Sequence, residues 1–125
     1  GVRIAVSEKS AYDLYLTRSL RHATLVRAPG LARTFERFTS EGIEAMAGIR
    51  QQLDRLAETH PGHRVLTESI TAIQQAMGTP AGRPAGAAYL QAFVEEMKRT
   101  GFVAAALAAS GQTDAQVAPA AEEGA

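Results

Sequence analysis

Short apolar segments alternate three times with amphipathic ones in the N-terminal part of the chain, and this alternation limits the possible folds most strongly. Three runs rich in Val, Ile, Leu and Ala have the composition of short strands, at residues 2–6, 22–27 and 43–48. After each run, apolar side chains recur at helical spacing, in residues 10–20, 31–40 and 50–59. Consecutive strand–helix units favour a mostly parallel sheet flanked by helices, so the expected fold class is α/β.

The alternation ends at the His-Pro-Gly sequence of residues 60–62, which predicts a turn. A fourth strand is expected at residues 63–67 and an extended stretch at residues 69–77, with no helix between them. The last two expected helices cover residues 85–99 and 102–109. The strand–helix alternation is therefore broken in this part of the chain.

Composition excludes several classes of function. With 125 residues, 46% hydrophobic and 21% charged, the chain suits one soluble globular domain. A formal net charge of zero disfavours a nucleic-acid-binding protein, which usually carries a basic surface. The absence of cysteine excludes disulfides, cysteine nucleophiles and thiolate metal sites. The sequence has no apolar run long enough to span a membrane. It begins at the edge of an expected strand, so we expect no signal peptide in it and expect it to be a piece of a longer protein.

The first strand–helix junction is the strongest candidate for a binding site. Ser10 suits the N-cap of the first helix, and Asp13 has the spacing of a capping-box partner. The unpaired N–H groups at Ala11 and Tyr12 would carry the positive end of the helix dipole. Such a helix end can hold a carboxylate, and the alternative is an ordinary capped helix with no ligand.

The order of elements resembles that of the periplasmic solute-binding proteins of bacterial ABC uptake systems, in family 3, which binds amino acids and related polar solutes. The resemblance rests on residues 1–6 with 10–16, on Gly42-Ile43-Glu44-Ala45-Met46-Ala47-Gly48, and on residues 74–80 leading to 89–102. The last of these stretches has a returning strand and then a helix that closes on Gly101-Phe102. The resemblance extends from residue 1 to about residue 111 and implies a type II periplasmic-binding-protein-like fold.

The resemblance also implies a domain division. Residues 1–70 resemble the second lobe of such a protein, residues 71–80 the crossover or hinge strand, and residues 81–110 the C-terminal helices. Residues 111–125, rich in Gln, Ala, Pro and Glu, are expected to form a disordered tail. The first lobe is then absent, and the helix at 85–99 lacks its usual partner. We expect its apolar stripe either to fold back onto the N-terminal lobe or to form a homodimer with a second copy; the stripe comprises Tyr89, Phe93 and Met97.

In the family, the turn before the first helix of this lobe holds the carboxylate of the ligand through hydroxyl and backbone N–H groups. These groups correspond to Ser10, Ala11 and Tyr12. Lys9 stands where the family usually has glycine, and its side chain could add positive charge to an anion site.

The family also has an acid just after the third strand, where it pairs with the ammonium group of the ligand. This chain has Arg50 in that segment, which cannot accept a hydrogen bond from an ammonium. The departure favours either a ligand held mainly by the missing lobe or a ligand without an amino group, such as an organic acid. Arg50 could donate a bidentate contact to a carboxylate of such an acid. Alternatively, Arg50 is a solvated first-turn residue. Gln74, next to Gln75 on the presumed crossover, is a further ligand-binding candidate, unless this strand is only a solvated connection.

The resemblance therefore implies a non-enzymatic, extracytoplasmic solute-binding component of an ABC transporter. Two lobes would close on a small polar or anionic solute, an amino acid or organic acid, and a membrane permease would recognise the closed state. We expect no catalytic residue, cofactor or metal, and His60 and His63 are expected to belong to a turn. The alternatives are a cyclohexadienyl-dehydratase-like enzyme, which would need a general acid from the other lobe, and a ligand-sensing domain of the same fold.

Overall fold

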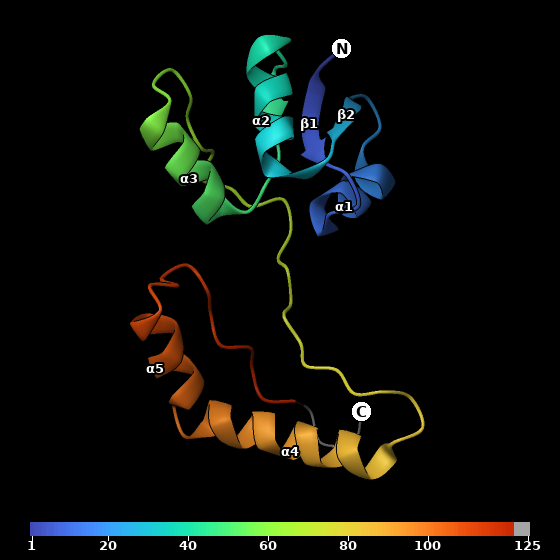
Figure 1. Ribbon diagram of the computed structural model, residues 1–125, viewed down its shortest axis with the longest axis vertical. Coiled ribbons are helices and arrows are strands. Elements are labelled where there is room, and N and C mark those ends of the chain that lie inside the picture. The colour runs from blue at the N-terminus through green and yellow to red at the C-terminus, as the bar shows by residue number, and fades with distance from the viewer. Residues whose placement is uncertain (122–125) are drawn as a thin grey trace. The chain divides into compact units, whose positions relative to one another are not determined.

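A computed structural model describes residues 1–121 of the chain (Figure 1). The chain forms two compact units, of which the first is Gly1–Ile73 and the second begins at Gln74. Unit 1 contains three strands and three helices: β1 (Arg3–Ser7), α1 (Ala11–Ser19), β2 (Thr24–Ala28), α2 (Gly30–Ser40), β3 (Ala45–Met46) and α3 (Arg50–Thr59). Unit 2 contains α4 (Pro84–Arg99) and α5 (Phe102–Ala109).

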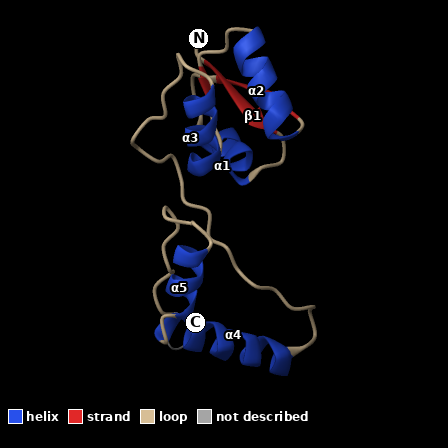
Figure 2. Ribbon diagram, turned by 60° about the vertical axis from the view of Figure 1, so that its left-hand side comes forward, coloured by secondary structure: helices blue, strands red, loops and turns tan. Residues whose placement is uncertain are grey.

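The strands of unit 1 form a parallel sheet in the order β2-β1-β3. Ile4 of the central strand lies opposite Leu25 on one side and Ala45 on the other. Helices cover the sheet (Figure 2), and the predicted α/β class with a parallel sheet flanked by helices is confirmed. The third strand is shorter than the predicted run of residues 43–48, because only Ala45 and Met46 pair with β1.

Side chains of β1 alternate between two helices. Val6 is fully buried and packs with Tyr12 and Leu16 of α1, in a cluster that also includes Ala47. Ser7, the next residue, instead meets α2, where its hydroxyl lies 3.1 Å from the buried Thr34 hydroxyl. Thr34 also donates to the Gly30 carbonyl at 2.7 Å, so its polar group is buried without loss of hydrogen bonding. Each large apolar side chain in this core contributes roughly 1.5–3 kcal/mol through burial.

Aromatic contacts join the C-terminal end of α3 to α2. The His60 ring lies 4.6 Å from the Phe35 ring between centroids, and His63 lies 5.3 Å from Phe38. Both histidines belong to the turn that follows α3, as expected. The apolar side of α3 is only half-buried, however, although the sequence predicts that it faces the interior; it comprises Leu53, Leu56 and Ala57.

The predicted strand at residues 63–67 is wrong, because this segment has no regular secondary structure. A strand needs a neighbour that satisfies its backbone groups, and β3 pairs only with β1 among the described strands. The carbonyls of Leu66 and Thr67 accept hydrogen bonds from Arg50 instead.

An ion pair ties the start of β1 to the residue before β3. Arg3 donates from Nε and Nη2 to the Glu44 carboxylate at 3.1 and 2.9 Å, and its backbone N–H donates to the same group at 2.8 Å. These bonds from Arg3 lower the pKa of Glu44 from its ordinary value of 4.5 to about 2. The pair therefore links the first residue of β1 to the residue before β3, next to the point where these two strands begin to pair.

This depressed pKa predicts an acid-dependent contribution to stability. Because the folded state has the lower pKa, the Glu44 carboxylate stabilises the fold fully above pH 4.5, and this contribution is lost as the pH falls towards 2. Urea unfolding should therefore find Glu44→Gln less stable than wild type at neutral pH, with a gap that closes on acidification. A gap that stays constant with pH would contradict the assignment.

Unit 2 consists of two helices joined by a tight turn. Gly101 joins α4 to α5 with a left-handed φ of 81°, a conformation that glycine adopts without steric cost. Residues 111–121 have no helix or strand, yet Lys98 donates to the Pro119 carbonyl at 2.8 Å and Glu95 accepts from the Ala121 N–H at 3.1 Å. The part of the expected disordered tail at residues 122–125 lies outside the described residues.

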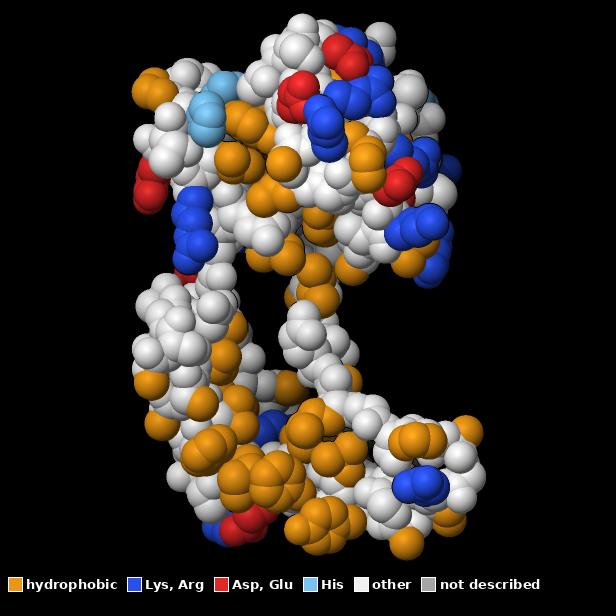
Figure 3. Space-filling model, in the orientation of Figure 1, with side chains coloured by type: hydrophobic (Ala, Val, Ile, Leu, Met, Phe, Trp, Pro, Cys, Tyr) orange, Lys and Arg blue, Asp and Glu red, His pale blue; other side chains and the backbone are white. Residues whose placement is uncertain are grey.

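The apolar stripe on α4 is largely accessible to solvent. Tyr89 is 75% exposed and Phe93 43% exposed, whereas Met97 is half-buried. Phe102 of α5 adds a further exposed ring, and the surface view shows hydrophobic side chains gathered over these helices (Figure 3).

Pairing of this stripe with a second copy stays a prediction that sedimentation velocity can test. If two chains bury the stripe, Tyr89→Glu should shift a concentration-dependent dimer to monomer, because a carboxylate is costly in an apolar interface. Tyr15→Glu is the matched control, since Tyr15 is an exposed tyrosine of unit 1. A wild-type chain that sediments as a monomer at every concentration would rule out this pairing.

Candidate anion-binding site

The sheet topology marks one edge as the candidate site. From β1 the chain moves to β2 on one side, and from β2 it crosses to β3 on the other side. The gap between the carboxyl ends of β1 and β3 is therefore a topological switch point, where open α/β sheets bind ligands. The loops that begin there are residues 8–10 after β1 and residues 47–49 after β3.

The first of these loops is built around Ser10, which is the N-cap of α1 as predicted. Its hydroxyl accepts from the Asp13 N–H at 3.1 Å and donates to the Ser7 carbonyl at 2.7 Å. Asp13 reaches back to accept from the Lys9 N–H at 2.9 Å, one residue before the position in a standard capping box. Because the Ser10 proton is already bonded, Ser10 shapes the turn more than it offers a free donor.

The free donors lie one step further along the helix. None of the residues 1–121 accepts a hydrogen bond from the N–H of Ala11 or Tyr12. Ala11 is exposed, while the Tyr12 ring is buried in the core and anchors the first turn. Two backbone donors at the positive end of α1 therefore remain for an anion.

Lys9 adopts the conformation that glycine favours. Its φ of 61° is the only positive φ at a non-glycine residue within the described part of the chain. An L-residue in this region costs about 1–2 kcal/mol. The turn thus has a backbone suited to glycine, the residue that the family resemblance leads one to expect here, although the sequence has lysine.

A buried carboxylate holds this turn against the sheet. Asp13 is 5% exposed and accepts from Arg27 Nε of β2 at 2.9 Å as well as from Lys9. Arg27 also donates to the Thr17 hydroxyl at 2.8 Å. Sequence reasoning missed the Asp13–Arg27 pair, because nothing local connects two residues so far apart in the chain.

Arg50 occupies the other side of the switch point, at the start of α3. Its guanidinium donates to three neutral acceptors, namely the Leu66 and Thr67 carbonyls at 3.0 Å each and the Ser69 hydroxyl at 3.4 Å. No carboxylate among the described residues forms an ion pair with it. Gly48 keeps this loop compact, because a Cβ there would lie 3.1 Å from the Leu53 side chain.

The structure thus brings Ser10, Ala11 and Tyr12 together at one helix end and sets Arg50 at the start of α3, after the 47–49 loop that follows β3. Within residues 1–121, no hydrogen bond joins Arg50 to these three residues. Gln74, the remaining predicted site residue, is exposed, has no regular secondary structure and belongs to unit 2. Its part in binding stays a prediction.

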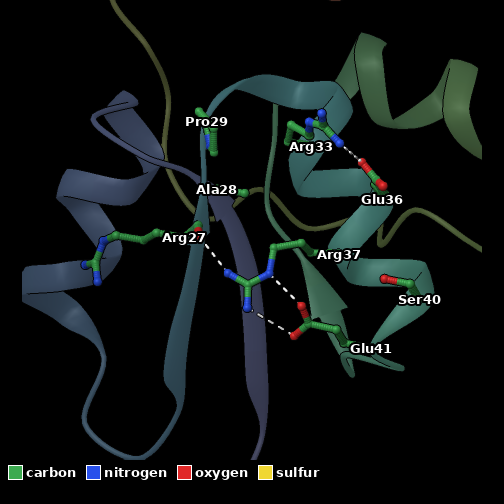
Figure 4. Close-up of a pocket in the computed structure, with 8 residues that line it drawn as sticks. All are labelled: Arg27, Ala28, Pro29, Arg33, Glu36, Arg37, Ser40 and Glu41. Carbon is green, nitrogen blue, oxygen red and sulfur yellow. Dashed lines mark hydrogen bonds and ion pairs between the residues drawn. The ribbon is translucent and has the colours of Figure 1, made fainter.

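A shallow hollow elsewhere on unit 1 is lined mainly by charged side chains (Figure 4). Arg33 pairs with Glu36 at 2.7 Å, and Arg37 pairs with Glu41 at 2.6 Å while donating to the Arg27 carbonyl at 3.0 Å. Because these arginines are already neutralised, the hollow offers an anion less than the switch point does.

Searches among protein-family models, curated proteins and solved structures found nothing that matches this chain. Within residues 1–121, no three His, Asp or Glu side chains are grouped to hold a metal ion. No helix in the described part of the chain is long and apolar enough to cross a membrane.

The left-handed φ of Lys9 predicts how substitutions at this position change the free energy of unfolding. Lys9→Gly should raise the free energy of unfolding by about 1 kcal/mol, because glycine relieves the backbone strain. Lys9→Val should lower it by at least about 1 kcal/mol, because a β-branched residue is a clear outlier at this φ. Chemical denaturation measures both, and equal stability of the two variants would argue against this turn conformation.

Proposed function

We propose that unit 1 is the ligand-binding lobe of an extracytoplasmic solute-binding protein of an ABC uptake system. The ligand is a small carboxylate without an amino group, held at the switch point between β1 and β3. The supporting fold observation is the parallel β2-β1-β3 sheet with capped α1 at its carboxyl edge. The type II binding fold is part of this proposal.

The uncompensated charge of Arg50 carries the proposal. The other arginines with side-chain hydrogen bonds within residues 1–121 each pair with a carboxylate; they are Arg3, Arg27, Arg33, Arg37 and Arg99. Arg50 instead adds a positive charge to the N-terminal end of a helix, where the dipole already disfavours a cation. An anionic ligand removes this unfavourable arrangement.

The hydrogen-bond donors on the two sides of the switch point suit a carboxylate ligand. The Ala11 and Tyr12 amides supply two N–H groups, and Arg50 supplies the charge. A ligand ammonium, by contrast, needs an acceptor after β3, and the first turn of α3 contains no acid. Unit 1 therefore favours an organic acid over an amino acid.

The mechanism in this proposal is binding without chemistry. The solute binds at this edge of unit 1, a second lobe closes over it, and a membrane permease recognises the closed state. No cofactor or catalytic residue takes part.

Backbone NMR of the full 125-residue chain tests the ligand class, because it detects millimolar binding. Succinate and aspartate form a matched pair that differs by one ammonium group. Succinate should shift the Ala11 and Tyr12 amide resonances, and aspartate should do so much less. Equal shifts with both ligands would contradict the amine-free assignment, and no shift with either would contradict the site.

Charge-assisted hydrogen bonds contribute about 1.5–3 kcal/mol, so Arg50→Gln should weaken succinate binding at least about tenfold. Arg55→Gln is the control, because Arg55 is an exposed arginine on the same helix. Equal affinities of the two variants would remove Arg50 from the site.

A further inference from the structure

The segment that leaves unit 1, residues 64–73, is held by hydrogen bonds from a single side chain. Every hydrogen bond that the described residues make to the segment 64–73 comes from the side chain of Arg50. Its two Nη atoms contact consecutive carbonyls, those of Leu66 and Thr67, at 3.0 Å each, and Nη2 also reaches Ser69. A planar guanidinium suits this paired contact, because its N–H groups form a rigid fork.

Apolar packing adds little to this anchor. Leu66 is 66% exposed and Ile70 50% exposed, and only Val65 and Thr71 are half-buried. The segment also has no strand or helix that would hold it through a backbone ladder. Its course therefore depends on a few side-chain contacts rather than on a core.

We propose that Arg50 is a latch that fixes residues 66–69 to the N-terminal end of α3 and thereby sets where the chain leaves unit 1. Arg50 acts here as a positioning residue. The latch is a property of the ligand-free chain and stands apart from the proposed function.

The geometry of the guanidinium allows latch and ligand to coexist. Its Nε–H and one Nη1–H have no acceptor within residues 1–121, so the three bonds to the segment leave donors free. Breaking the latch does not leave unit 1 without a core, because the core cluster of Val6, Tyr12 and Leu16 includes neither Arg50 nor residues 66–69.

Backbone ¹⁵N relaxation of the ligand-free chain tests the latch. In wild type, residues 66–69 should have order parameters close to about 0.85, and in Arg50→Gln these should fall below about 0.6, the range of flexible backbone. Arg50→Lys should also lose order, because a point charge cannot hold two carbonyls as a fork does. Arg55→Gln should keep the wild-type values.

Unchanged β1, α1 and α2 chemical shifts in Arg50→Gln would show that the variant folds. Low order parameters at residues 66–69 in wild type would overturn the latch, as would unchanged values in Arg50→Gln. These outcomes involve no ligand, so they are distinct from a failure of the succinate titration. Trypsin supplies a second measurement, since cleavage after Arg64 should accelerate in Arg50→Gln if the latch holds the wild-type segment.

Discussion

The hydrogen bonds to the Asp13 carboxylate hold the candidate site in place. This buried group accepts from the backbone of Lys9, from the Arg27 side chain and from the Thr17 hydroxyl, and so joins the turn, α1 and β2. The Asp13–Arg27 pair alone adds little, because Arg27 is 42% exposed and pairs open to water contribute at most about 1 kcal/mol. The larger effect is geometric, since the carboxylate accepts from the N–H of Lys9, the residue with the left-handed φ.

Arg27 of β2 and Arg50 of α3 differ in the charge of their hydrogen-bond partners. Arg27 is neutralised by Asp13 and cross-links the fold, whereas Arg50 binds only carbonyls and a hydroxyl. Neutral acceptors orient a guanidinium without cancelling its charge. Arg50 therefore keeps its positive charge, whereas Arg33 and Arg37 in the hollow beside α2 are paired with glutamates, and for this reason the anion proposal rests on Arg50.

Much of the fold follows from local signals in the sequence. The helices at residues 50–59 and 102–109 have the predicted bounds, since Gly and Pro residues mark their ends, and the Ser-x-x-Asp spacing located the N-cap at Ser10. The strand predicted at residues 63–67 does not form, because strand composition cannot supply a neighbouring strand. The partners of Arg50 could not be predicted either, because they lie 16 and 17 residues away in the chain. The positive φ of Lys9 could not be predicted from the residue type, because lysine rarely adopts it.

The contacts of Arg50 also bear on how strongly such a site can bind. A free arginine side chain has about 2 kcal/mol of rotamer entropy, which a ligand must overcome to hold it in one orientation. Here folding has already restricted the side chain, through three acceptors in residues 66–69. A carboxylate that accepts from one of the remaining donors then meets a preorganised cation, and preorganisation raises affinity without any new contact. If Arg50 binds the proposed carboxylate, residues 66–69 then orient the side chain that receives it.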